Sequence, residues 1–484
     1  VQQLTQSWLQ ALDALATHAT SPNAGGHTPS DFPLAELSQE EIEQLEAARP
    51  GIMDIWPLAP MQEVLVAHEL NDEQVPGAYI TQLVIELRGA LDIGALRAAA
   101  ETLLRRHPNL RAGFWYDGLD KPVQFVPEDI ELPWSERHLS GLPSQECAAE
   151  ITRLLAADRA RRFDLTKAPL TRFTVLSLGP DRHQMVWTVH HILVDGWSMP
   201  VLLDELMALC RQPDERGPTS TTPYREYLNW LATQDRAQAE RAWQEMLAGL
   251  ENPTLVTLPD PTRRPEAPEH VTVELSEDVT QELQQRARQH GLTMNTMVQG
   301  AWALVLGRLT GRDDVVFGTT VSGRPPEIAG VETMAGFFMN TLPVRVRLDP
   351  AETLAQMLAR VQDHQAAMTQ HQNVSLAEIQ RLTGLGDLFD TVTVFENYPD
   401  SPQTAVNGLR ATVIDAHDAW HHPLRLIAVP GPKLVLQLWY RPDLFDHGTA
   451  QQIARRVAWL PETMAADLEQ PVGEITAAPS RRGR

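Results

Sequence analysis

Hydrophobic and polar residues along the chain follow two alternating periods. Apolar residues recur at every second position in short runs, as in β-strands, at 78–87, 170–176, 183–190 and 424–429. Between such runs the apolar residues have helical spacing, at 93–105, 198–210, 280–290, 296–309 and 449–464. Strands that alternate with helices over most of the length predict an α/β fold.

The length and the turn-rich stretches predict more than one domain. A chain of 484 residues corresponds to two or three domains at about 150 residues each. Residues 4–17 have helical spacing, and a run of turn formers follows at 21–31. Since the chain begins with Val1 rather than Met, we expect a piece of a longer polypeptide. We predict an upstream tail and linker (1–49), an N-terminal lobe (50–222), inter-lobe helices with a proline-rich connection (223–268), a C-terminal lobe (269–475) and the start of a downstream linker (476–484).

Charge and cysteine content narrow the classes of partner. The formal net charge of −23 opposes a surface that binds phosphates, so we expect neither nucleic acid nor an anionic membrane as partner. Cys147 and Cys210 are too few for a disulfide framework and have no metal-ligand spacing, which favours a cytoplasmic protein without a metal site. No apolar run reaches the length of a membrane span.

The run His190-His191-Ile192-Leu193-Val194-Asp195-Gly196 is the strongest candidate for chemistry. It follows an apolar strand at 185–189, so the two histidines should point to opposite faces of a sheet. Asp195 and Gly196 suit a tight turn, and the helix expected after them begins near Ser198. A histidine on an apolar strand is most often a hydrogen-bonded core residue, and that alternative stays open at this point.

This run resembles the HHxxxDG active-site motif of the condensation domains of nonribosomal peptide synthetases, within the chloramphenicol-acetyltransferase-like superfamily. Four further runs are similar to motifs of that family in the same order, at 54–63, 106–114, 224–231 and 334–345. The resemblance covers roughly residues 50–475 and rests on five separate motifs in the same order. The chain departs from the first motif at Val64 and Ala67, where the family usually has Gly and Phe.

The resemblance implies a fold and a reaction. The fold would be two chloramphenicol-acetyltransferase-like lobes in a V-shaped pseudo-dimer with a central tunnel. A donor peptidyl or aminoacyl thioester and an acceptor aminoacyl thioester would enter from opposite sides, each on the phosphopantetheine of a peptidyl carrier protein. Adenylation and epimerisation domains would be neighbours, the domain would be a monomer, and no cofactor would be bound permanently.

The resemblance also implies roles for individual residues. His191 would be the catalytic residue, either as base or by orienting the amine, and His190 would support its loop. Asp195 would pair with an arginine of the second motif, Arg111 or Arg106, and the Gly196 N–H would face the site. Three residues are candidate tunnel or substrate contacts: Trp197, Ser322 and Asn340.

Subtype and alternatives follow from the same residues. The continuation at 196–202 and the tail before residue 31 resemble condensation domains that take a donor ending in a D-residue and an L-acceptor. Three alternatives remain: a coenzyme-A-dependent acyltransferase, an epimerisation domain, or a catalytically silent member that recruits partner enzymes. The fifth motif and the residues after Gly196 weigh against the first two, and the intact His191 and Asp195 weigh against the third.

Overall fold

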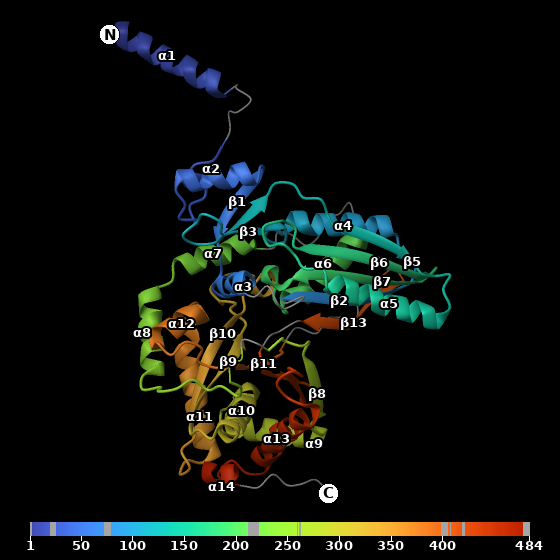
Figure 1. Ribbon diagram of the computed structural model, residues 1–484, viewed down its shortest axis with the longest axis vertical. Coiled ribbons are helices and arrows are strands. Elements are labelled where there is room, and N and C mark those ends of the chain that lie inside the picture. The colour runs from blue at the N-terminus through green and yellow to red at the C-terminus, as the bar shows by residue number, and fades with distance from the viewer. Residues whose placement is uncertain are drawn as a thin grey trace.

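The computed structural model describes residues 2–19, 26–71, 79–211, 222–258, 260, 263–397, 405–406, 408–418 and 422–477. Within these residues the chain forms two α/β lobes, each built on a six-stranded sheet (Figure 1). Parts of the predicted linkers, at 21–25 and 478–484, lie outside the described residues, as do residues 212–221 at the end of the predicted N-terminal lobe.

The N-terminal lobe contains the sheet that carries the histidine pair. Its strands are, in spatial order, β12 (Ala405–Val406), β13 (Leu409–Asp418), β2 (Ile80–Arg88), β7 (Arg182–His190), β6 (Thr171–Gly179) and β5 (Trp134–His138). The pairs β13–β2, β2–β7 and β7–β6 are antiparallel, and β5 runs parallel to β6.

The period of two along β7 places its residues on two different faces. Met185, Trp187 and Val189 enter the main core of the lobe, which includes apolar residues of α4 (Ile93–Arg106) and α6 (Ser198–Arg211). Val186 lies on the opposite face, in a small cluster with residues of α5 (Ser144–Arg159). β7 therefore delivers its last residues to both sides of the sheet, as the alternation predicts.

A smaller sheet and a helix cover the start of this lobe. The sheet has the order β1 (Ile52–Pro57), β4 (Val123–Pro127) and β3 (Gly113–Trp115). It shares a cluster of buried apolar residues with Ile42 and Leu45 of α2 (Gln39–Ala48). Between β1 and β2 lies α3 (Pro60–Asn71), which begins with a proline at a position where no intrahelical N–H is required.

The C-terminal lobe repeats the α/β architecture. Its strands are, in spatial order, β10 (Asn340–Arg347), β9 (Asp314–Val321), β11 (Thr391–Phe395), β14 (Leu424–Val429), β15 (Val435–Tyr440) and β8 (Glu269–Glu274). One core joins this sheet to α9 (Glu277–Gln289), α10 (Met294–Thr310), α11 (Leu354–Met368) and α13 (His447–Ala466). Further helices are α7 (Tyr224–Ala232), which packs on the N-terminal core, α8 (Arg236–Leu247), α12 (Leu376–Thr383) and α14 (Val472–Ala477).

Two segments of the C-terminal half belong structurally to the N-terminal lobe. Strand β13 pairs with β2 from Arg410↔Arg88 to Asp418↔Thr81, and Figure 1 shows it in orange beneath the N-terminal strands. The segment 331–339, between β9 and β10, buries its apolar side chains in the N-terminal core. The segment predicted as the C-terminal lobe (269–475) thus contributes β13 to the N-terminal sheet, where it covers the edge that β2 would otherwise expose.

Helix α1 (Gln2–Ala19) confirms the helical spacing at 4–17, but it stands apart from both lobes (Figure 1). Its apolar residues are exposed, with Trp8 at 65% and Leu15 at 64%. Helical period alone predicts the element without predicting what it packs against.

Candidate active site

The histidine pair lies where β7 ends and the chain turns towards α6. His191–Leu193 form a short 3-10 turn, closed by the Val194 N–H donating to the His191 carbonyl at 3.2 Å. The His191 N–H donates to the carbonyl of Tyr79, just before β2, at 2.7 Å. Gln62 of α3 donates to the Ile192 carbonyl at 2.8 Å. Contacts from two neighbouring elements thus hold the backbone of the motif.

The His191 ring has a defined orientation. Its Nδ1 lies 2.7 Å from the carbonyl oxygen of Val194. Because a carbonyl only accepts, Nδ1 must carry the hydrogen, and in the neutral ring the lone pair is then on Nε2. Phe337 of the segment 331–339 lies edge-on to the ring, with 5.5 Å between the ring centroids. The residue is 7% exposed, so it is buried but a small part of its surface remains accessible to solvent.

His190 points elsewhere and contacts the loop from behind. Its Nδ1 accepts from the Ile192 N–H at 3.1 Å, and its Nε2 lies 3.6 Å from a carboxylate oxygen of Glu69 in α3. The ring is 1% exposed, and burial lowers the pKa of His190, which keeps the imidazole neutral. Its hydrogen is then on Nε2, directed towards Glu69.

Asp195 is paired with Arg324, which follows β9 of the C-terminal lobe. The Nη2 of Arg324 lies 3.1 Å from Oδ1 of Asp195, and both side chains are 4% exposed. The other carboxylate oxygen accepts from the Phe338 N–H at 3.2 Å. The guanidinium also donates to the carbonyls of Val331 and Met334 and lies over the Phe338 ring, 4.1 Å from its centroid.

The predicted pairing of Asp195 with Arg111 or Arg106 is therefore wrong. Arg106 ends α4 and pairs with Glu205 of α6 at 3.0 Å. Arg111 points towards the small sheet, where it donates to the Glu128 carbonyl. Both arginines are occupied within the N-terminal lobe, whereas the charge that neutralises Asp195 comes from the other lobe.

Ser198 links the motif to the segment 331–339. Its hydroxyl lies 2.6 Å from Asp195 Oδ1 and 2.8 Å from the Gly336 carbonyl, and it accepts from the Gly336 N–H at 3.0 Å. The Nη2 of Arg324 donates to the same oxygen at 2.9 Å. This buried hydroxyl donates its one hydrogen to Asp195 or to Gly336 and accepts from Gly336 and Arg324, which fixes the loop that bears His191 against the other half of the chain.

The other predicted site residues have mixed positions. Gly196 is half-buried, and its φ is not among the positive values of the described residues, so the turn does not depend on a left-handed glycine. Trp197 is half-buried and donates to the Glu332 carbonyl at 2.9 Å. Ser322 is exposed just after β9.

Asn340 does not suit substrate contact. Its side-chain amide donates to the carbonyls of Gln372 and Val374, both at 2.8 Å, and its oxygen accepts from the Thr341 N–H. The residue is 2% exposed. Because both amide hydrogens are used and the side chain is buried, Asn340 ties β10 to a neighbouring loop.

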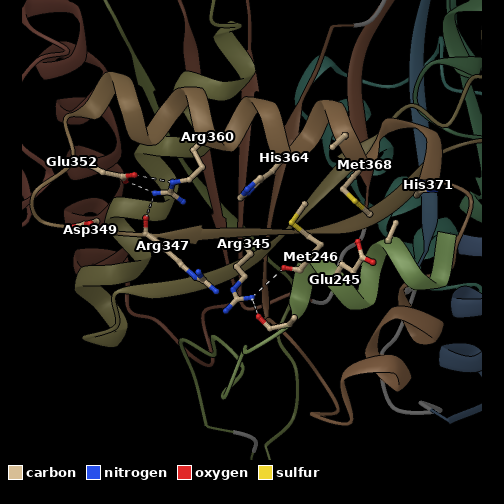
Figure 2. Close-up of a pocket in the computed structure, with 13 residues that line it drawn as sticks. Glu245, Met246, Arg345, Arg347, Asp349, Glu352, Arg360, His364, Met368 and His371 are labelled. Carbon is tan, nitrogen blue, oxygen red and sulfur yellow. Dashed lines mark hydrogen bonds and ion pairs between the residues drawn. The ribbon is translucent and has the colours of Figure 1, made fainter. Parts of the chain in front are cut away.

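A pocket of about 680 Å³ opens on the C-terminal lobe between α8, β10 and α11 (Figure 2). Two of its arginines are paired: Arg345 donates to Asp314, which lies outside the pocket lining, and Arg360 pairs with Glu352 at 2.6 Å. His364 points from α11 into it, where burial, followed by Arg360, lowers the pKa of the ring. None of the residues that line this pocket belongs to the histidine motif.

The described part of the chain contains neither a metal-binding cluster nor a membrane-spanning helix. No three histidine, cysteine or acidic side chains among the described residues converge as a metal ion would require. None of the described helices combines the length and the apolar character needed to cross a membrane.

Comparisons with known proteins agree with one another. Residues 52–483 match the family model described as Condensation domain. A linear gramicidin synthase protein from Brevibacillus parabrevis is 35% identical over 99% of this chain, which spans 6% of that protein. Bacitracin synthase 3 from Bacillus licheniformis is 31% identical over 98% of the chain, again within 8% of the relative. The chain thus corresponds to a small part of much longer proteins.

Solved structures give the same fold. The X-domain from teicoplanin biosynthesis is 25% identical, with a TM-score of 0.74 over 86% of this chain and 96% of that one. The first condensation domain of the calcium-dependent antibiotic synthetase, in complex with a substrate analogue, gives a TM-score of 0.69 at 22% identity over 86% and 98% of the two chains. The predicted two-lobed α/β class is confirmed.

Proposed function

The chain belongs to the condensation-domain family, and from this premise we propose that it forms amide bonds in nonribosomal peptide synthesis. The donor is a peptidyl or aminoacyl thioester on a carrier protein. The acceptor is the α-amine of an aminoacyl thioester on a second carrier protein. The names of the relatives, synthases of gramicidin and bacitracin, support this class of product.

The observation that carries the proposal is the orientation of the His191 ring. With Nδ1 held by the Val194 carbonyl, Nε2 is the nitrogen that can accept a proton. An α-amine has a pKa of about 7.7–8.0, so a fair fraction is neutral near pH 7 and a mild base or acceptor is sufficient.

The bond changes balance without any further reactant. The amine nitrogen attacks the thioester carbonyl, a C–N bond forms, and the C–S bond breaks. The amine proton reaches the departing sulfur either directly or by way of Nε2 of His191, which accepts it and then donates it, so that the sulfur leaves as the thiol of the donor phosphopantetheine and the imidazole is neutral again. Whether the imidazole takes the proton or only orients the amine, it acts from the same position.

Asp195 supports the reaction by holding the loop that bears His191 in place. Its carboxylate is neutralised by Arg324 and bonded by Ser198, so it supports the loop without accepting the substrate's proton. We propose that the Gly196 N–H and Trp197 lie beside the reacting groups. We also propose that a passage between the lobes lets both phosphopantetheine arms reach Nε2 of His191.

We further propose that the donor ends in a D-residue and that the acceptor is an L-residue, with an epimerisation domain upstream. The support is the sequence continuation at 196–202 and the tail before residue 31. A monomeric domain between two carrier proteins fits this arrangement. Single-turnover assays with D- and L-configured donors test the subtype, since equal rates would contradict it.

A second candidate is a catalytically silent domain that recruits another enzyme. It is favoured by one observation: the X-domain from teicoplanin biosynthesis, which resembles this chain, has also been solved in a complex with OxyB. A coenzyme-A-dependent acyltransferase is a third candidate, which the same assay with acyl-coenzyme A would detect.

The test uses donor and acceptor carrier proteins loaded with aminoacyl groups. We expect the wild type to form a dipeptidyl thioester and His191→Ala to lose most of that rate. His138→Ala, at an exposed position at the end of β5, is the matched control and should retain it. Product from His191→Ala at the wild-type rate would contradict the proposal, and absence of product from the wild type would favour the silent domain.

A further inference from the structure

Tyr79, directly before β2, has an unusual backbone conformation. Its φ is +58°, and it is the one non-glycine residue with a positive φ among those that the structure describes. The left-handed region is unfavourable for an aromatic residue because its Cβ approaches the following carbonyl. Tyr79 is 4% exposed, so this conformation lies inside the lobe rather than in a surface turn.

The contacts of Tyr79 converge on the histidine motif. Its carbonyl accepts the His191 N–H at 2.7 Å. Its hydroxyl lies 2.5 Å from Nδ1 of His68 in α3, and the two rings are stacked. The ring also lies near His190, with 6.4 Å between centroids.

The pairing of β2 with β7 shows what the conformation achieves. The ladder ends at Ile80↔His190, so Tyr79 lies opposite His191. At this point β7 passes into the 3-10 turn, and the His191 N–H keeps the partner that the antiparallel register gives it, the Tyr79 carbonyl. Tyr79 therefore forms this inter-strand bond, one residue beyond the last ladder pair, from a left-handed conformation.

Strain of this kind persists only where the surroundings determine it. Here the surroundings are the buried ring and the bond between the phenol and His68, neither of which belongs to the histidine motif. The anchored side chain therefore maintains a backbone conformation whose carbonyl holds the residue that bears the reactive imidazole.

We propose that Tyr79 is a positioning residue for His191: its phenol, anchored on His68, keeps its carbonyl in the left-handed conformation that fixes the His191 backbone. This inference rests on the proposed function, because it takes His191 as the acting imidazole. Tyr79 itself contacts neither substrate nor carrier protein in this role.

Three substitutions separate backbone conformation from side-chain packing. Tyr79→Gly removes the anchor but adopts positive φ without strain. Tyr79→Val removes the anchor and, being β-branched, resists positive φ. Tyr79→Phe removes only the hydroxyl that contacts His68.

We expect the amide-forming kcat to fall roughly 10- to 100-fold in Tyr79→Val, because a small displacement of the imidazole has effects of this size. Tyr79→Gly should stay within about fivefold of wild type, and Tyr79→Phe should lie between the two. The KM for either carrier protein should not change, since Tyr79 is buried. Ile85→Val, a core change on the same strand, controls for loss of stability and should leave kcat unchanged.

Equal kcat values for Tyr79→Gly and Tyr79→Val would overturn the inference, as would a change confined to KM. Thermal denaturation of each variant shows whether it is folded, and kcat is compared only among folded variants. Should Tyr79→Gly fail to fold, Tyr79→Asn takes its place, because Asn also tolerates the left-handed region. His191→Ala in the same assay keeps the two proposals apart. Its full activity would contradict the proposed function, whereas an inactive His191→Ala beside equal Tyr79→Gly and Tyr79→Val rates would contradict the positioning role alone.

Discussion

Arg324 and Asp195 belong to different lobes, and their buried ion pair joins the segment 331–339 to the loop that carries His191. The pair is 3.1 Å long and both side chains are 4% exposed. Each partner has further hydrogen bonds, from Ser198 and Phe338 to the carboxylate and from the guanidinium to two carbonyls. The geometry of the site thus depends on both halves of the chain.

Removing the guanidinium should cost much stability. We expect Arg324→Met to lower the free energy of unfolding by about 3–5 kcal/mol, because it leaves the Asp195 charge buried and unpaired. Urea unfolding measures this value. The double variant Asp195→Leu/Arg324→Met should regain part of the stability but not the amide-forming activity. Lys121→Met, which breaks the exposed pair with Glu36, is the control and should change stability little.

Loss of the Ser198 hydroxyl should loosen the junction of the two halves. Ser198→Ala leaves the buried Gly336 N–H and one donor of Arg324 without this acceptor, which we expect to cost about 1–3 kcal/mol. We also expect a lower kcat with unchanged KM for both carriers. Ser322→Ala, at an exposed position, should leave stability unchanged. A contact between Ser322 and the substrate would show as a change in the KM for the loaded carrier proteins at unchanged kcat.

Stability should fall towards acid pH because of His190. Burial lowers the pKa of His190, so below its unfolded pKa of about 6.5 the unfolded state binds more protons than the folded state. Stability therefore decreases as the pH falls from 6.5, by at most about 1.4 kcal/mol per pH unit for one group. His190→Gln should reduce the slope of unfolding free energy against pH between about 5 and 6.5. An unchanged slope would mean that His190 is not held neutral.

Gly323 should tolerate no side chain. Its φ is +61°, and an added Cβ would overlap the carbonyl oxygen of Phe338. We expect Gly323→Ala to displace the segment that packs Phe337 against His191, lowering both the melting temperature and kcat. Gly141→Ala is the matched control, because a Cβ there meets no atom within 4 Å and its φ is not positive. Similar melting temperatures for the two variants would show that the segment can move freely.

The elements that follow from local pattern could be predicted. The strand at 424–429 has the predicted bounds, and the helix predicted at 93–105 is Ile93–Arg106. In these stretches the period of the apolar residues reports directly on the face that is buried. The place of the motif at the end of β7, and the separation of His190 from His191, follow from the same alternation.

The contacts that complete the site could not be predicted in this way. The partner of Asp195 lies 129 residues further along the chain, and no local period indicates which arginine reaches it. Tyr79 and Glu69 also act through pairings that local periodicity does not report. The turn formers Pro76 and Gly77 precede Tyr79, but tyrosine itself is not a residue type that signals a left-handed φ. For Arg324 the sequence offered one signal: it is a cation directly after a strand, in the run 321–326, a few residues before the fifth motif at 334–345.

Strand β13 has a consequence for recombining such proteins. It enters the N-terminal sheet from the C-terminal half and pairs with β2 along its length. In a chimera joined between the lobes, β13 would come from one parent protein and β2 from the other. The two parents would then have to pair within one sheet and not only across a surface. Exchange of one half for another therefore requires residues 405–418 to be matched to the recipient, independently of where the two genes are spliced.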